Sequence, residues 1–172
     1  MRFPYGKLLI ALCICTITLL STGCGIYTTK DVSIDYSKVK TVRIGFIQNK
    51  ASYINPQLSP RLTDNIQQKV VQFTKLKRVD TDDAHYQIDG YINGYNVTTS
   101  GVAGQQAVTN RLTVAVHITF KNTVENDTKE FDISRDFDFP ATQSLNQAET
   151  QLLESIVRNL TDEIFNRVFS NW

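Results

Sequence analysis

Residues 111–120 read RLTVAVHITF, and this stretch decides the fold. Every second residue is large and apolar, namely Leu112, Val114, Val116, Ile118 and Phe120. The residues between them are polar, charged or small. Successive side chains of a strand point to opposite faces of a sheet, so the alternation predicts a strand with one buried and one exposed face.

Three further stretches alternate in the same way and predict strands with inward residues Val42, Ile44 and Phe46; Tyr86, Ile88 and Ile92; and Phe131, Ile133, Phe137 and Phe139. Arg135 falls on the inward side of the last strand and predicts a bulge or a frayed register there. Residues 122–127 predict a hairpin turn, and the glycine-containing residues 98–106 predict a mobile loop.

Two stretches have the helical spacing of apolar residues. Ser59 and Pro60 predict an N-cap and a first helical residue, and the inward face would carry Leu62, Ile66, Val70 and Phe73, with the end near Leu76. Ser144 or Asn146 is expected to cap the second helix, whose inward stripe would be Leu152, Ile156, Leu160, Ile164 and Val168, widened by Leu153, Val157 and Phe165.

The element order therefore predicts an α+β, two-layer sandwich of the order β-α-β-β-β-α. A four-stranded mixed or antiparallel sheet would carry both helices on one face, because each strand has one apolar face and each helix one apolar stripe. The helix between the first two strands allows a right-handed parallel crossover, so the sheet would be either mixed or antiparallel, and the last three strands would form an antiparallel meander. The other face of the sheet would be polar and open.

The N-terminus has the order of an export signal. Arg2 and Lys7 precede the apolar residues 8–20, and Ser21-Thr22-Gly23-Cys24 follows. Thirteen helical residues reach about 20 Å, short of the roughly 30 Å bilayer core. A cysteine after small residues is typical of a bacterial lipoprotein, with residues 1–23 removed and Cys24 carrying a diacylglycerol and an N-acyl chain. A secreted protein and an uncleaved anchor are the alternatives.

We expect residues 24–37 to be a lipidated tether and residues 38–172 to form a single domain. The chain has 18 basic and 17 acidic residues, and loss of Arg2 and Lys7 leaves one net negative charge. This balance argues against a general nucleic-acid binder. Of the three cysteines, Cys13 and Cys15 lie in the signal, so the mature domain would hold no disulfide.

Five cations are candidate contacts for phosphate. Lys75, Lys77 and Arg78 form the tightest basic cluster, while Arg43 and Arg111 point outward from predicted strands. Lysine and arginine suit phosphate oxygens. The same cluster also suits the C-terminal end of a helix, whose dipole favours cations, and the two arginines also suit ordinary solubility.

The sequence contains no nucleophile elbow, P-loop or zinc-protease motif. Asp82, Asp83 and His85 lie at a predicted turn, where adjacent carboxylates are usually solvated. We therefore expect no catalytic residue, no metal site and no cofactor besides the covalent lipid on Cys24, and hence no enzyme activity.

Short segments along the whole mature chain resemble the LptE family of lipopolysaccharide-assembly lipoproteins, in its Bacteroidetes form. They are Cys24-Gly25-Ile26-Tyr27, Val39-Lys40-Thr41-Val42, Asn55-Pro56-Gln57-Leu58-Ser59, Asn110-Arg111-Leu112-Thr113-Val114, Phe120-Lys121-Asn122-Thr123, Asp162-Glu163-Ile164-Phe165-Asn166 and Ser170-Asn171-Trp172. The resemblance implies a lipoprotein on the periplasmic face of the outer membrane, which partners the LptD β-barrel and binds lipopolysaccharide. The open sheet face and residues 98–106 would contact the barrel.

One rival function stays open from the residues alone, a stand-alone periplasmic lipoprotein that binds a lipid or a glycan. It would need a sizeable apolar pocket between the sheet and the helices.

Overall fold

The computed structural model describes residues 34–104 and 106–170. The predicted signal peptide, Cys24 and Trp172 lie outside the described residues. In chain order the elements are β1 (Thr41–Ile44), β2 (Gln48–Asn49), α2 (Leu58–Phe73), β3 (Lys77–Arg78), β4 (Tyr86–Ala103), β5 (Gln106–Asn122), β6 (Asp127–Pro140) and α3 (Leu145–Phe169). Neither described helix is both long enough and apolar enough to cross a membrane.

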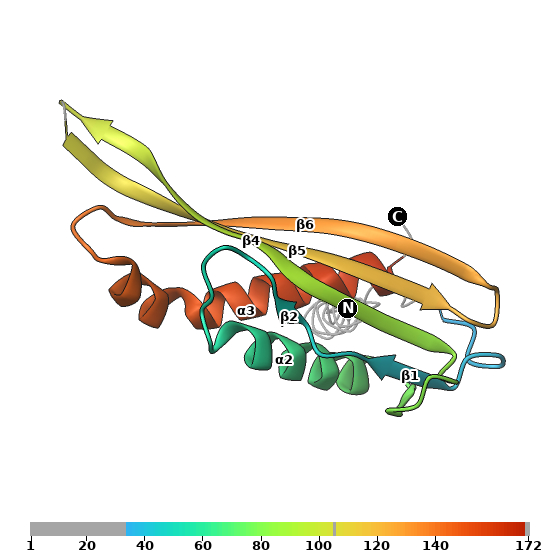
Figure 1. Ribbon diagram of the computed structural model, residues 1–172. Helices are drawn as coiled ribbons and strands as arrows, with labels where there is room; N and C mark the ends of the chain where they lie inside the picture. The colour runs from blue at the N-terminus through green and yellow to red at the C-terminus, as the bar shows by residue number, and fades with distance from the viewer. Residues whose placement is uncertain (1–33, 105, 171–172) are drawn as a thin grey trace, which may run out of the picture. The chain divides into compact units, whose positions relative to one another are not determined.

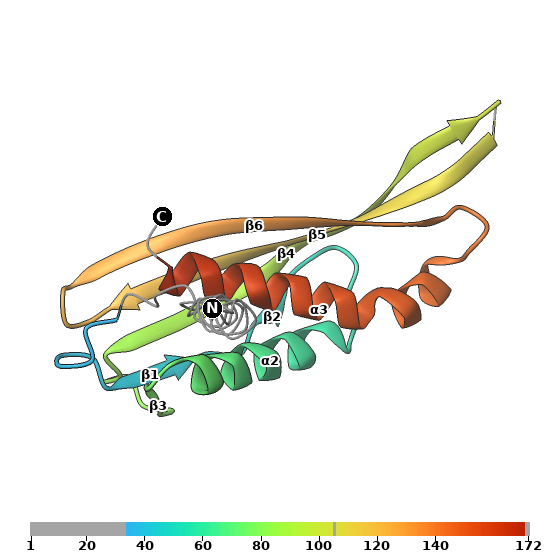
Figure 2. The same ribbon diagram turned by 180° about the vertical axis from the view of Figure 1, so that it is seen from behind.

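The predicted α+β arrangement is confirmed. One sheet has the strand order β3-β1-β4-β5-β6, and α2 and α3 lie side by side on one of its faces (Figures 1 and 2). As predicted, β4, β5 and β6 pair antiparallel. Strand β1 pairs with β4 in parallel through the α2 crossover, so the sheet is mixed rather than antiparallel. The predicted count of four strands is wrong, because β2 pairs with β4 and β3 pairs with β1. Both are two residues long, too short to show an alternation.

The predicted mobile loop at residues 98–106 is also wrong. Antiparallel pairing of β4 with β5 continues to Ala103 and Gln106, so most of this stretch is the end of a long hairpin. Neither α2 nor α3 covers this end, which rises away from the layers (Figure 1). The described residues bury neither face of the hairpin there, and its sequence lacks the alternation of apolar and polar residues that reveals a strand. Gly104 adopts φ +65°, a conformation that favours glycine in the turn.

The core lies between the sheet and the helices. All five inward residues predicted for residues 111–120 are buried, together with Val42, Ile44, Ile88 and Ile92. Phe46, predicted to be inward, is 57% exposed, and Ile47 is buried instead. Strand β1 ends at Ile44, and the chain then turns so that the Ile47 N–H donates to Thr63 Oγ1 of α2 (3.0 Å). Ile34 and Tyr36 also pack against the core, so the packed structure includes part of the predicted tether.

Arg135 does lie on the helix-facing side of β6, but the predicted bulge is absent. Val114 pairs with Arg135 in an uninterrupted register between β5 and β6. The long side chain extends past the core and donates to Glu163 Oε2 of α3 (2.6 Å). A polar residue at an inward position is tolerated here because its charged end reaches a partner at the surface.

The start of α2 differs from the prediction. The helix begins at Leu58 with Gln57 as N-cap and no side-chain cap, and Ser59 is buried in the first turn. Asn55 Oδ1 accepts from the Gln57 N–H (2.9 Å), which fixes the turn before the helix and sets the fully buried Leu58 at its first position. The helix ends at Phe73 rather than near Leu76, and Phe73 is half exposed rather than inward.

The start of α3 agrees with the prediction, because Ser144 is its N-cap. The Gln147 N–H donates to Ser144 Oγ (3.4 Å), and the Ser144 N–H donates to Gln147 Oε1 (3.0 Å). This reciprocal pair is a capping box.

Replacing Ser144 with alanine is expected to lower the free energy of unfolding by about 1 kcal/mol, because the helix loses a side-chain acceptor for its first N–H groups. Urea unfolding followed by circular dichroism measures the change. Ser144→Asp keeps an acceptor and should stay close to the wild type. Equal losses in both variants would contradict the capping role.

Candidate functional site

The predicted phosphate contacts on the strands are ion-paired. Arg43 donates to Asp89 Oδ2 (2.7 Å) and lies 3.5 Å from Asp82. Arg111 donates to Asp138 Oδ1 (2.8 Å) and Oδ2 (3.1 Å). The hydrogen bond from Arg111 lowers the pKa of Asp138 below its ordinary value. Both arginines therefore hold carboxylates across neighbouring strands of the open face.

The other predicted cations lie at the β3 edge of the sheet. Lys77 and Arg78 form β3, and Arg78 donates to Gln67 Oε1 of α2 (2.8 Å). The Lys75 ammonium lies 5.7 Å from the centre of the Tyr36 ring. The stretch just after α2 is thus partly tied down by local contacts.

The structure does not bring the five cations together. Arg43 is in register with Gln87, and Gln87 with Lys121, which is ten residues along β5 from Arg111. Ten residues of strand span about 34 Å. Arg111 therefore lies far along the sheet from Arg43, and the phosphate-contact role of the five residues stays a prediction.

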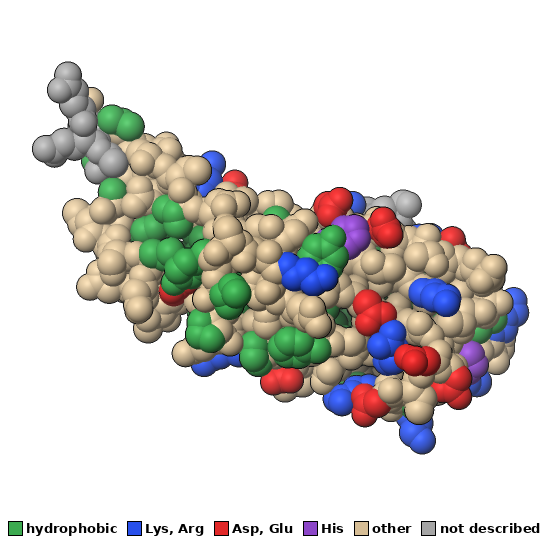
Figure 3. Space-filling view, viewed as in Figure 1, with side chains coloured by type: hydrophobic (Ala, Val, Ile, Leu, Met, Phe, Trp, Pro, Cys, Tyr) green, Lys and Arg blue, Asp and Glu red, His purple; other side chains and the backbone are tan. Residues whose placement is uncertain are grey.

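A row of polar contacts crosses the middle of the open face (Figure 3). The Lys50 ammonium lies 4.4 Å from the centre of the Tyr91 ring, which lies 5.2 Å from the His117 ring. His117 Nδ1 is 2.8 Å from Asp132 Oδ1. The face is polar, as predicted, and its charges are largely paired. Within the described residues, no three histidine, cysteine or acidic side chains gather as metal ligands.

The free end of the β4–β5 hairpin is the most distinctive surface of the domain. Pairing of β6 with β5 stops where Pro140 faces Thr109, and pairing of β2 with β4 stops at Ile92. Residues 97–108, called here the hairpin tip, extend beyond both. They contain no charged residue, and Val97, Val102 and Val108 are exposed. Sheet edges are usually protected by charge, and this one lacks that protection.

A buried polar network ties the root of the hairpin to α3. The Tyr95 hydroxyl of β4 donates to Glu149 Oε1 (2.7 Å), and the Tyr53 hydroxyl donates to Glu149 Oε2 (3.2 Å). The two tyrosine rings stack with centroids 5.3 Å apart. Glu149 is only 8% exposed. No pattern in the sequence predicts this network, and its one signal is a glutamate, Glu149, beside the apolar stripe of α3.

Tyr95 makes the stability of the domain sensitive to alkaline pH. Burial, and next the hydrogen bond to Glu149, raise the pKa of Tyr95 above its ordinary value. The folded protein therefore holds the proton where the unfolded chain has lost it, so stability present below about pH 10 falls as the pH rises further.

Replacing Tyr95 with phenylalanine is expected to make this alkaline loss shallower. The difference in slope between wild type and variant should approach about 1.4 kcal/mol per pH unit above pH 10. Urea unfolding at a series of pH values from 8 to 11.5 measures it. Parallel curves for the two proteins would contradict the assignment.

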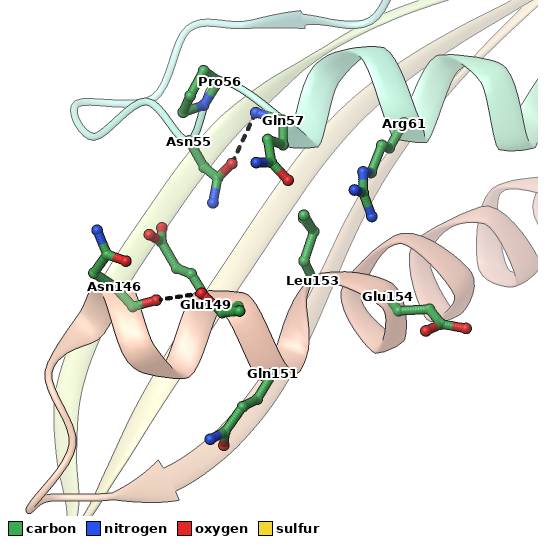
Figure 4. A pocket seen from close by; sticks show the side chains of 10 residues that line it. Asn55, Pro56, Gln57, Arg61, Asn146, Glu149, Gln151, Leu153 and Glu154 are labelled. Carbon is green, nitrogen blue, oxygen red and sulfur yellow. Dashed lines mark hydrogen bonds between the residues drawn. The ribbon is translucent and has the colours of Figure 1, made fainter.

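A polar cavity of about 380 Å³ lies beside this network, between the start of α2 and the N-terminal part of α3 (Figure 4). Asn55, Gln57 and Arg61 line it from the α2 side, and Asn146, Glu149 and Glu154 from α3. In Figure 4 the Glu149 carboxylate points across the gap toward Asn55. Asn55 is itself 6% exposed.

Comparison with known proteins agrees with the resemblance noted in the sequence. Residues 39–168 match the family model described as LptE, lipopolysaccharide-assembly. No curated protein matches the chain.

Three solved structures are similar in structure to this chain, although their sequence identity to it is low. A hypothetical protein, CT253, from Chlamydia trachomatis is 8% identical, with a TM-score of 0.50 over 74% of this chain and 96% of that one. Rare lipoprotein B from Shewanella oneidensis is 13% identical, with a TM-score of 0.47 over 73% and 89%. The PelC dodecamer from Paraburkholderia phytofirmans is 11% identical, with a TM-score of 0.49 over 84% and 96%. Since the family model spans β1 through most of α3, this chain belongs to the LptE family of lipopolysaccharide-assembly proteins.

Proposed function

We propose that this chain is the lipoprotein partner of an LptD-like β-barrel and assists the placing of lipopolysaccharide at the cell surface. Membership of the LptE family carries the proposal. Cys24 would anchor the mature chain to the outer membrane on its periplasmic side. The protein would act by binding and would catalyse no reaction.

The surface of the domain supports such a partnership. The open sheet face is polar and its arginines are paired, as in Arg43 with Asp89 and Arg111 with Asp138. A protein enclosed by a barrel needs satisfied polar surfaces. The hairpin tip, whose edges pair with no further strand among the described residues and whose valines are exposed, is our candidate for the first contact with the barrel.

The rival function of a free lipid carrier gains no support from the core. Large, fully buried side chains fill the space between sheet and helices, among them Ile88, Ile92, Leu112, Ile118, Ile156 and Leu160. The cavity beside Glu149 is polar and does not suit an acyl chain.

Purification of the full chain, tagged at the C-terminus, from its native membranes in mild detergent tests the partnership. We expect an LptD-like barrel in a ratio near one to one. Recovery of the chain alone, with the barrel present in the starting membranes, would overturn the proposal.

Photocrosslinking tests the contact surface. A photoreactive residue at Val102, in the hairpin tip, should form a crosslink to the barrel. The matched control is Val124, which is also exposed but lies in the turn between β5 and β6. Equal crosslinking at both positions, or crosslinking only at Val124, would exclude the tip as the contact.

A further inference from the structure

We propose that the cavity between the start of α2 and the N-terminal part of α3 binds a neutral, hydroxyl-rich group of the saccharide class. The cavity is open to solvent and lies at the lower end of the volumes usual for ligand sites. The inference concerns this cavity alone and stands whether or not a barrel partner exists.

Glu149 has hydrogen-bonding capacity to offer a ligand in the cavity. This carboxylate is nine-tenths buried, and the described residues place no cation within 4 Å of it. Each of the two carboxylate oxygens accepts one hydrogen bond from a tyrosine hydroxyl. A carboxylate accepts about four hydrogen bonds, so Glu149, which lines the cavity, keeps acceptor capacity for a ligand.

Amide side chains line the cavity around Glu149. Asn55, Gln57 and Asn146 contribute amides, each with donors and an acceptor. A sugar hydroxyl also both donates and accepts, so amides can satisfy it in either role.

The lining of the cavity disfavours phosphates and acyl chains. Glu149 and Glu154 outnumber Arg61 as charges on the lining, so the cavity repels a phosphate rather than attracting it. An acyl chain would cover the remaining hydrogen-bonding capacity of the Glu149 carboxylate and of the lining amides without satisfying it, which is costly. A neutral group rich in hydroxyls satisfies the lining without either cost.

Ligand-observed saturation-transfer NMR on the full chain in mild detergent tests the site, with glucose, galactose, mannose and N-acetylglucosamine as probes. We expect at least one to bind, and glucose 6-phosphate to bind more weakly than glucose. Absence of binding by all four, or tighter binding of the phosphate ester, would overturn the proposal.

Two variants locate the binding. Glu149→Gln removes the charge but keeps the shape, and a lost hydrogen bond to a charged group corresponds to about a tenfold weaker affinity or more. Asn146 is exposed and takes no part in the hydrogen bonds between the tyrosines and Glu149. Asn146→Ala therefore leaves that network intact and should also weaken binding. Gln68→Ala, on an exposed part of α2 outside the cavity lining, is the matched control and should bind like the wild type. Unchanged binding in Asn146→Ala, or equal loss in Gln68→Ala, would refute the site.

Competition identifies the source of the saccharide. If purified lipopolysaccharide displaces the bound monosaccharide, the site reads the sugar part of a glycolipid. If it does not, while the Asn146→Ala effect holds, the site takes a free saccharide. Failure of the barrel purification leaves both results unaffected, so the two proposals fail separately.

Discussion

Replacing Ile156 with alanine is expected to lower the free energy of unfolding by about 2–5 kcal/mol. Ile156 is fully buried in the middle of α3, which packs against α2, β5 and β6. Truncation removes apolar surface from the core and leaves a cavity that packed strands and helices close only in part. Since small domains are stable by roughly 5–15 kcal/mol, this one change removes a large share of the total.

Urea unfolding followed by circular dichroism measures the loss. Val71→Ala is the matched control, because Val71 lies on α2 with about half of its side chain exposed. The control should change stability by less than about 0.5 kcal/mol. A loss below about 1 kcal/mol for Ile156→Ala would show that α3 does not close the core.

Replacing Gly90 with alanine is expected to destabilise the domain by about 3 kcal/mol, at the upper end for overpacking. Gly90 lies on the core side of β4, opposite Ile118 of β5. An added Cβ would lie 2.5 Å from the His117 carbonyl oxygen and 2.7 Å from Ile118 Cδ1. The side chain can move, but the carbonyl belongs to the backbone of a central strand, so the strands themselves would have to shift.

The same unfolding measurement applies, with Gly101→Ala as the control. An alanine at residue 101 would meet only side-chain atoms of Thr109 and Val108, at 3.2 Å or more, and it lies in the hairpin tip away from the core. We expect a change below about 1 kcal/mol there. Equal losses at both glycines would mean that the cost comes from strand conformation in general rather than from the contact at His117.

The fold could be predicted from the sequence where a strand or a helix has one buried and one exposed face. Residues 111–120 carry an unbroken alternation because one face of this part of β5 is buried in the core. The inward stripe of α3 was predictable in the same way, because one side of the helix is buried. The cap at Ser144 was predictable because a capping residue is a local pattern in the sequence. Where burial does not alternate, the signal is lost, and so the hairpin tip was predicted to be a loop.

The candidate sites were less predictable, because they depend on residues that meet only after folding. Tyr53, Tyr95 and Glu149 lie in a loop, a strand and a helix, up to 96 residues apart. The cations at residues 75–78 were found as a cluster because they are neighbours in the chain. The ion pairs of Arg43 and Arg111 arise only when strands far apart in sequence are placed side by side.

The amino-acid sequence thus predicted the α+β class, the order of the main strands and helices, the antiparallel meander, most of the residues that each element buries and the resemblance to the LptE family. The physical reason is that the hydrophobic period and the capping residues are local properties of the chain. Only the tertiary structure decided the length of the β4–β5 hairpin, the burial of Ile47 in place of Phe46, and the polar cavity around Glu149. These depend on which surfaces meet in space, and no period in the sequence records that.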